Sequence, residues 1–256
     1  MNAVESGLIT NGEYITYKAT DDALAGLFVK KPDSDKAELF SAGTKFTVEG
    51  KYEFYSLDLA GNRSIIVTVT LDNTSPEGKL YADGVELESG LFKSAESISF
   101  TANDAISGVK TLLVKLPGKS EFTSYNSGDK LTENGRYEFK AVDRAGNESG
   151  IYSIVLDNIV PVGKLTADGI EFESGAVTNR GSVIFIATDE ISGIAVLYVK
   201  IGEEPWQVYA AGEEITKEGV IRFYCEDVAG NRSAEYFITV DRTKPVGTLS
   251  SPDGGY

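Results

Sequence analysis

A five-residue motif, Asp-x-Ala-Gly-Asn, occurs three times and contains the residue types best suited to binding chemistry. Its copies begin at Asp58, Asp143 and Asp227, so they are 143 − 58 = 85 and 227 − 143 = 84 residues apart. Asp and Asn offer the oxygen ligands that Ca²⁺ prefers. They also favour a tight turn, because Gly and Asn tolerate left-handed backbone and Asp accepts backbone N–H bonds. The turn is the interpretation adopted here, with calcium binding as the alternative.

Two further sets of aspartates recur with the same period. One set ends a strand and the other stands at the junctions between repeats; they are Asp21, Asp104, Asp189 and Asp72, Asp157, Asp241. Calcium-dependent rigidity at the junctions is therefore a hypothesis. Each position has only one or two carboxylates within sequence reach, whereas Ca²⁺ takes roughly six to eight oxygens. The sequence thus assigns no metal, cofactor or catalytic residue, and calcium stays an alternative.

The composition excludes several kinds of chemistry. The chain has no His, which rules out His-based acid-base catalysis and His-containing zinc sites. The single Cys, Cys225, aligns with Ser56 and Ala141, so we expect a small buried core residue and no intrachain disulfide. Adjacent acidic residues in a strand point to opposite faces and cannot form a catalytic pair. We expect no enzymatic activity.

The charge is acidic and spread along the chain, with 39 acidic and 24 basic residues and a net charge of −15. Such a surface does not attract nucleic acid or an anionic membrane, and it favours a soluble monomer. No apolar run approaches the ~20 residues of a membrane span. Because Met1 starts inside a repeat and no secretory signal opens the sequence, we expect a fragment whose signal and anchor lie elsewhere.

Four aromatic residues occupy equivalent positions in two repeats. The pairs are Phe122 with Trp206 and Tyr125 with Tyr209, each 84 residues apart (206 − 122 and 209 − 125). Equivalent positions favour a shared packing role. An exposed aromatic platform for a sugar is the alternative, with Trp206 as its first candidate.

The period divides the chain into four segments. Residues 1–73 form a first repeat that lacks its first strand, 74–158 a second, 159–243 a third, and 244–256 the start of another. Short alternating strands separated by turn signals, without a helical period, predict an all-β, two-sheet sandwich in each repeat. Pro76, Pro161 and Pro245 follow the last strands closely, which predicts an elongated and stiff array.

The repeat resembles the tandem bacterial immunoglobulin-like (Big-type) repeats of cell-surface and adhesin proteins. The resemblance rests on the Gly-x-Tyr-x-Phe strands at Gly50 and Gly135, the three Asp-x-Ala-Gly-Asn turns, and the Asp-x-Thr-x-Pro junction at Asp241. It covers nearly the whole chain. Ile221 departs from the strand Tyr in the third repeat, and Ile159 stands where the junction Thr is usual.

The resemblance implies three tandem immunoglobulin-like β-sandwich domains of about seven strands each. Tyr52 and Tyr137 would then form tyrosine corners, whose hydroxyls bond to backbone. The implied role is a non-catalytic structural or adhesive stalk, extracellular on a bacterial cell surface. Its expected partners are the neighbouring repeats and a host or cell-surface protein or glycan. The alternatives are a calcium-rigidified array and carbohydrate-binding accessory domains of a secreted enzyme.

Overall fold

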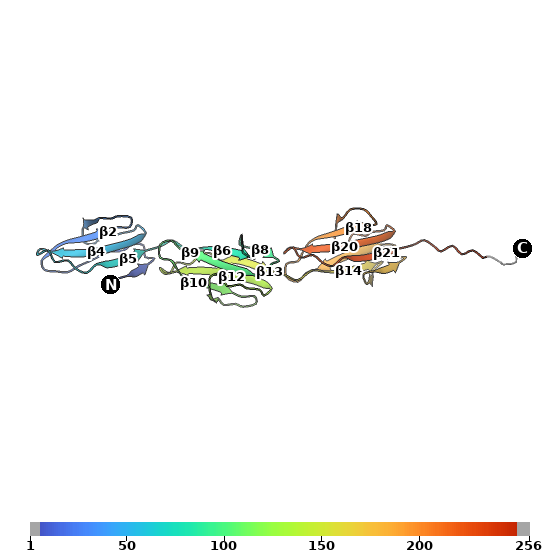
Figure 1. The fold of residues 1–256 in the computed structure, drawn as a ribbon, viewed down its shortest axis with the longest axis horizontal. Coiled ribbons are helices and arrows are strands. Elements are labelled where there is room, and N and C mark those ends of the chain that lie inside the picture. The colour runs from blue at the N-terminus through green and yellow to red at the C-terminus, as the bar shows by residue number, and fades with distance from the viewer. Residues whose placement is uncertain (1–5, 250–256) are drawn as a thin grey trace. The chain divides into compact units, whose positions relative to one another are not determined.

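The structure is a computed structural model that describes residues 6–249, and within that range every regular element is a β-strand (Figure 1). The expected all-β class of tandem β-sandwich domains is confirmed. No helix that could span a membrane occurs in the described residues. The chain divides into two compact units, Met1–Leu91 with Ala95–Val155 and Phe92–Ser94 with Leu156–Tyr256. The finer boundaries after residues 73, 158 and 243, and the elongated arrangement, stay predictions.

The second repeat is a complete sandwich of two sheets. A five-stranded sheet has the order β11-β10-β12-β13-β8, and a three-stranded sheet has the order β7-β6-β9. The ring of Phe100 in β9 stacks on that of Phe139 in β12 with centroids 5.0 Å apart, which joins the two sheets in one core. The strands are β6 (Glu77–Ala82), β7 (Val85–Leu87), β8 (Leu91–Lys93), β9 (Ile98–Asn103), β10 (Val109–Lys115), β11 (Thr123–Tyr125), β12 (Gly135–Asp143) and β13 (Tyr152–Leu156).

The third repeat has the same two sheets. Their orders are β16-β21-β20-β18-β19 and β15-β14-β17, and Phe185 stacks on Phe223 with centroids 4.9 Å apart. Cys225 lies fully buried in this core, as predicted, and burial raises the pKa of its thiol, which therefore stays protonated. The strands are β14 (Val162–Ala167), β15 (Ile170–Phe172), β16 (Ala176–Thr178), β17 (Val183–Thr188), β18 (Ile194–Ile201), β19 (Gln207–Tyr209), β20 (Gly219–Asp227) and β21 (Tyr236–Val240).

The first repeat has only one named sheet among the described residues, with the order β1-β5-β4-β2-β3. Its five named strands are fewer than the expected seven, and among the described residues none corresponds to β6, β7 or β9 of the second repeat. Residues 15–20, which correspond to β9 and β17, form no strand, although Tyr17 still stacks on Phe54 with centroids 5.2 Å apart. The strands are β1 (Leu8–Thr10), β2 (Leu24–Lys30), β3 (Ala37–Phe40), β4 (Gly50–Asp58) and β5 (Val67–Leu71).

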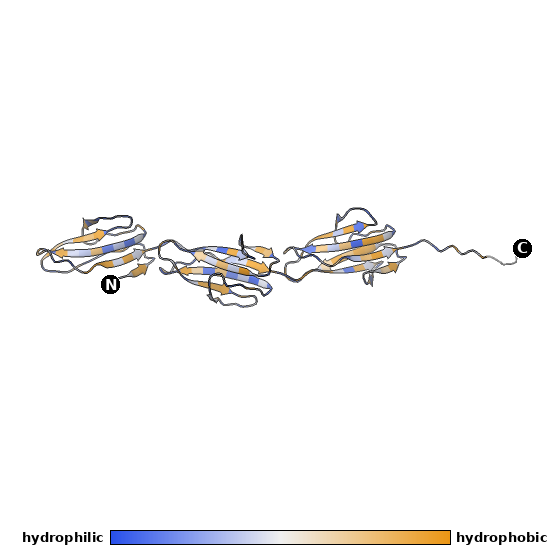
Figure 2. Cartoon of the chain, in the orientation of Figure 1, coloured by the Kyte–Doolittle hydropathy of each residue, from blue (hydrophilic) through white to orange (hydrophobic). Residues whose placement is uncertain are grey.

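The strands form where apolar and polar residues alternate. In β12, Tyr137, Phe139 and Ala141 are buried, while Glu138 and Lys140 between them lie on the outer face. Figure 2 shows this alternation as hydrophobic and hydrophilic residues following one another along the strands. Alternation with period two buries one face of a strand and leaves the other in water.

The expected tyrosine corners are present in the first two repeats. The hydroxyl of Tyr52 donates to the carbonyl of Val48, and that of Tyr137 to the carbonyl of Glu133, both at 2.7 Å. Burial raises the pKa of both hydroxyls, so they remain donors. The third repeat has Ile221 at this position and therefore lacks the bond.

The chain beyond β21 forms no strand in its described part, residues 241–249. The predicted start of a further repeat, 244–256, lies partly outside the described residues. It stays a prediction.

Candidate metal centre

The Asp-x-Ala-Gly-Asn motif folds as the predicted turn. In the second repeat, Oδ1 of Asp143 accepts from the backbone N–H groups of Gly146 at 2.6 Å and Asn147 at 2.8 Å. Oδ2 accepts from Nδ2 of Asn147 at 2.7 Å. Asp58 and Asp227 make the same two bonds to the Asn of their own motifs. The motif therefore fixes its carboxylate at the end of a strand.

The strand-ending aspartates organise a second loop. Oδ1 of Asp104 accepts three backbone N–H bonds, from residues 106, 107 and 108, at 2.8 to 3.2 Å. Oδ1 of Asp189 accepts the equivalent three bonds. All of these bonds go to one oxygen, so the loop leaves the second oxygen of each carboxylate available. Oδ2 of Asp189 is buried and has no hydrogen-bond partner among the described residues.

The junction aspartates reach forward into the next repeat. Oδ1 of Asp72 accepts from Thr74 N at 3.0 Å, and its Oδ2 accepts from Ser107 N at 3.1 Å. Asp157 repeats this arrangement with Ile159 and Ser192. Each junction carboxylate thus lies beside the loop that the strand-ending aspartate organises.

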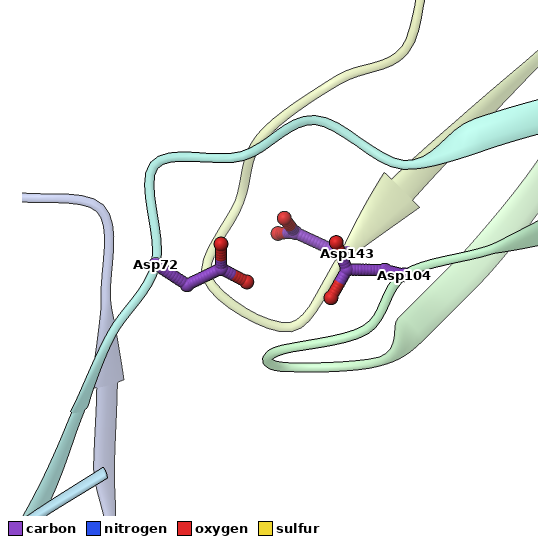
Figure 3. Close-up of side chains that lie close together, drawn as sticks. All are labelled: Asp72, Asp104 and Asp143. Atoms are coloured by element: carbon purple, nitrogen blue, oxygen red, sulfur yellow. The ribbon is translucent and has the colours of Figure 1, made fainter. Parts of the chain in front are cut away.

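These contacts gather one aspartate of each set into a cluster, and they do so twice. In the first cluster, Asp72, Asp104 and Asp143 each offer one carboxylate oxygen, and these atoms lie within 4.8 Å of one another. Figure 3 shows the three side chains pointing toward one another from three separate segments. The second cluster consists of Asp157, Asp189 and Asp227. The sequence predicted the three sets of aspartates but not that they meet.

The Asn that ends the motif joins the cluster to the preceding junction. Nδ2 of Asn147 donates to the backbone carbonyls of Asp72 at 2.9 Å and Thr74 at 3.1 Å. Nδ2 of Asn231 donates to the carbonyl of Asp157 at 2.8 Å. From the sequence, this Asn was expected to form its own turn or, as the alternative, to ligate calcium, and its contact with the linker was not predicted. No local pattern in the sequence places this Asn against the linker.

Each cluster brings three acidic side chains together, and no described Lys or Arg forms an ion pair with them. Asp72, Asp143 and Asp157 are fully buried, and Asp227 is 2% exposed. The ion pairs of the described Lys and Arg residues involve other acids, and none includes a cluster aspartate. Two unit charges 4.8 Å apart repel by roughly 3 to 4 kcal/mol at an effective dielectric constant of about 20. A bound cation would remove this repulsion and also satisfy the free oxygen of Asp189.

The ligand types select the class of ion. The clusters offer only oxygen atoms, which suit hard cations such as Ca²⁺ and Mg²⁺ rather than zinc or copper. Ca²⁺ accepts irregular sets of carboxylates, backbone carbonyls and waters from flexible loops, whereas Mg²⁺ demands near-octahedral geometry. Three carboxylates held by three loops fit Ca²⁺ better, with backbone carbonyls or waters completing the shell.

The first repeat contains only part of such a cluster. Asp21 is exposed and accepts a bond from Ala23 N at 2.7 Å, while Asp58 is half-buried in its motif turn. Hydrogen bonds from the side chain and backbone of Asn62 lower the pKa of Asp58. At the other end, Asp241 is exposed and accepts from Thr243 N at 2.9 Å. Within the described part of the chain, none of these three aspartates belongs to a group of three acidic side chains.

The aromatic residues at equivalent positions of the second and third repeats differ in how deeply they are buried. Tyr125 and Tyr209 are buried, and their hydroxyls accept from the backbone N–H of Phe100 and Phe185, so their predicted packing role is confirmed. Trp206 is half-buried and its ring meets that of Tyr224 edge-on, with centroids 4.7 Å apart.

Comparisons with known protein families and with curated proteins find no match. Among solved structures, the chain is similar to the fibronectin(III)-like modules of Clostridium thermocellum CbhA, with 21% identity over 67% of this chain and 100% of that chain, at a TM-score of 0.30. It is also similar to SGBP-B of the Bacteroides ovatus mixed-linkage glucan utilization locus, solved with a mixed-linkage heptasaccharide. That match has 10% identity over 94% of this chain and 67% of that chain, at a TM-score of 0.22.

Proposed function

We propose that this chain is a non-catalytic structural module whose junctions are held rigid by Ca²⁺ bound at the two aspartate clusters. One observation carries the proposal: three carboxylates from a junction, a loop and a motif turn converge within 4.8 Å in two successive copies. The junction residue of each cluster belongs to the linker, and the other two belong to the repeat that follows. A cation shared by them would fasten the linker to that repeat.

The proposed role depends on how the linker is held without metal. The bonds from Ser107 N to Asp72 and from Asn147 to the linker carbonyls give the junction a defined place. Repulsion among the carboxylates opposes that arrangement. Calcium would therefore convert a strained junction into a stable one. Extracellular modules use Ca²⁺ sites of about 10⁻⁴ to 10⁻³ M affinity, which suits a protein outside the cell.

The wider setting is part of the same proposal. Tandem sandwiches with Pro-containing linkers and dispersed negative charge suit a stalk or adhesive module of a bacterial surface protein, extracellular and of the Big-type immunoglobulin-like class. Such a module needs no active site, and we propose that this one has none. Neighbouring repeats of the same chain would be its main partners.

Thermal unfolding in calcium and in chelator tests the function. Asp104→Asn with Asp189→Asn removes one charge from each cluster and keeps an oxygen that can accept the loop bonds. At calcium concentrations about a hundredfold above the dissociation constant, binding would stabilise each junction by about 2.7 kcal/mol. We expect this gain to be lost in the double variant and kept in Asp21→Asn, the matched change outside the clusters. Identical melting with calcium and with chelator would refute the proposal.

A second candidate, glycan binding, is favoured by one feature of the third repeat. Tyr198, Tyr224 and Trp206 form a continuous aromatic group, and the Arg232 guanidinium lies 3.7 Å from the Tyr224 ring centre. Tyr224 is itself buried beneath Tyr198 and Arg232, so the half-buried Trp206 would be the ring that contacts a sugar. Trp206→Ala should abolish binding on a glycan array, whereas Phe122→Ala, the equivalent change in the second repeat, should leave it intact. An array on which the unmodified chain binds nothing removes this candidate.

A further inference from the structure

The outer face of the five-stranded sheet has different residues at four equivalent positions of the three repeats. Two positions are cross-strand partners, and a third follows the motif turn and bridges back to the strand before it. The fourth stands two residues before the partner on the edge strand. In chain order these residues are Phe28, Ala37, Tyr55 and Arg63 in the first repeat, Leu113, Phe122, Lys140 and Glu148 in the second, and Tyr198, Trp206, Tyr224 and Arg232 in the third.

In the third repeat the four residues form one connected group. The ring of Tyr224 stacks on that of Tyr198 with centroids 4.6 Å apart, and the ring of Trp206 meets it edge-on at 4.7 Å. The Arg232 guanidinium lies 3.7 Å from the same ring centre. Because Trp206 and Arg232 both contact Tyr224, they are close enough together for one short oligosaccharide to contact both.

The charge of Arg232 is not used in an ion pair. Arg232 is exposed, and none of the ion pairs of the described residues includes it. Glu226 is its backbone bridge partner, yet the guanidinium lies over the ring of Tyr224. By contrast, Arg222 on the same sheet face pairs with Glu235 at 2.8 Å. A guanidinium stacked on a ring keeps its in-plane N–H donors for another ligand.

The first repeat has the cation without the indole. Phe28 stacks on Tyr55 with centroids 5.1 Å apart, and the Arg63 guanidinium lies 5.4 Å from the Tyr55 ring centre. Ala37 stands where the third repeat has Trp206. The stacked arginine is therefore present, but the aromatic ring that would contact a sugar is absent from this position.

The second repeat has an aromatic ring without the arginine. Phe122 takes the place of Trp206, but Nζ of Lys115 and Nζ of Lys140 lie 5.7 and 5.2 Å from its ring centre. Glu148 takes the place of Arg232 and pairs with Lys140 at 2.9 Å. Among the described residues, only the third repeat combines a Trp at the fourth position with a stacked, unpaired arginine.

We propose that the third repeat binds an acidic polysaccharide, with Trp206 stacked on a sugar ring and Arg232 bound to the carboxylate of a hexuronic acid unit. A guanidinium binds a carboxylate through two parallel N–H bonds, which fixes the orientation of the ligand. An aromatic ring offers a flat apolar surface to the C–H groups of a sugar. The inference rests on the glycan-binding candidate and adds the charge of the ligand, and it does not depend on the calcium clusters.

Trp206 is the only Trp of the chain, so its fluorescence reports binding at this site. The full chain is titrated with oligosaccharides of galacturonic and of glucuronic acid and with their methyl esters, which keep the sugar and remove the charge. Chelator is present so that calcium cannot bridge the protein and the ligand. We expect a saturable change in fluorescence, with at least one of the acids binding about tenfold or more tightly than its ester.

Three variants assign the roles of the residues, and calorimetry measures their binding. Arg232→Gln should remove the preference, so that acid and ester bind alike. Trp206→Ala should abolish the binding of both. Arg63→Gln is the matched control, because it removes the equivalent arginine from a repeat without the indole, and it should change neither affinity. Thermal unfolding of each variant checks that the fold is kept.

The outcomes separate this inference from the proposed functions. Equal affinities for acid and ester in the unmodified chain would overturn the inference and leave glycan binding in place. A preference for the acid that survives Arg232→Gln would also overturn it, as would binding of sulfated but not of carboxylated sugars. A chain that binds none of the probes would overturn the inference, while a higher melting temperature in calcium would still support the metal clusters.

Discussion

The first and second repeats contain the same two loop aspartates in different surroundings. Asp104 and Asp143 meet the junction carboxylate of Asp72, whereas Asp21 and Asp58 meet none among the described residues. The motif turn is nevertheless the same, since Asp58 and Asp143 bond to their own Asn residues at nearly equal distances. The turn therefore belongs to each repeat by itself, while the cluster belongs to a repeat together with the linker before it.

The same division applies to the sheets. The complete repeats have a second sheet in which their first strands, β6 and β14, pair with β9 and β17, whereas the described residues of the first repeat form only one named sheet. The linker thus supplies a carboxylate to the repeat that follows and leads directly into its first strand. Four predictions test this contrast, in order of decreasing expected effect.

The largest effect is expected for Asp143→Asn. Removing one charge should abolish most of the calcium-dependent stabilisation of the second repeat, about 2.7 kcal/mol at a hundredfold excess over the dissociation constant. Asp58→Asn makes the same change in the same turn outside a cluster. Differential scanning calorimetry in calcium and in chelator, on dilute protein, should show the loss only for Asp143→Asn. Equal losses would mean that the turn, and not the cluster, responds to calcium.

Gly163→Ala tests the first strand of the third repeat. The added Cβ would lie 2.5 Å from the Phe185 ring and 2.7 Å from the Tyr236 ring, so these rings would have to shift. We expect a loss of about 1–3 kcal/mol in the free energy of unfolding, measured by urea denaturation. Gly247→Ala is the counterpart in the unpaired tail, where nothing lies within 4 Å. A similar loss there in dilute protein would contradict the contrast between paired and unpaired strands.

Tyr137→Phe removes the hydroxyl of a tyrosine corner. The lost bond to the Glu133 carbonyl should cost about 0.5–1.5 kcal/mol. Tyr52→Phe should cost a similar amount in the first repeat, because its bond to Val48 has the same length of 2.7 Å. The corner does not involve the linker, so complete and incomplete repeats should respond alike to denaturant. Unequal costs would show that the first repeat differs beyond its missing strand and carboxylate.

The smallest effect concerns the pKa of Asp58. The side chain of Asn62 is the largest cause of its lowered pKa, so Asn62→Ala should raise that pKa toward the ordinary value. A lowered pKa in the folded state stabilises the fold above the ordinary pKa, and this stabilisation is lost as the pH falls through the folded-state pKa. NMR titration of the carboxyl carbon measures the shift. An unchanged pKa in Asn62→Ala would show that Asn62 does not hold the carboxylate.

The sequence predicted much of this fold because its signals are local. The alternating residues of β12, the motif turns, the burial of Cys225 and the missing first strand all follow from a period of two or from the repeat itself. The two aspartate clusters could not be predicted from such local signals. Asp72, Asp104 and Asp143 are too far apart in sequence for any local pattern to show that they meet. Only the path of the linker brings them together, and that depends on tertiary contacts such as those of Asn147.

The central claim is that Ca²⁺ binds at the two aspartate clusters. Its most direct test is a calcium titration of the dilute protein, followed residue by residue in ¹H–¹⁵N NMR spectra. The account predicts two bound ions per chain, with saturating shifts at residues 72–74, 104–108 and 143–147 and at their counterparts in the third repeat. The loops that contain Asp21 and Asp58 should shift little over the same range. Equal responses in all three repeats, or no saturable response in the complete ones, would contradict it.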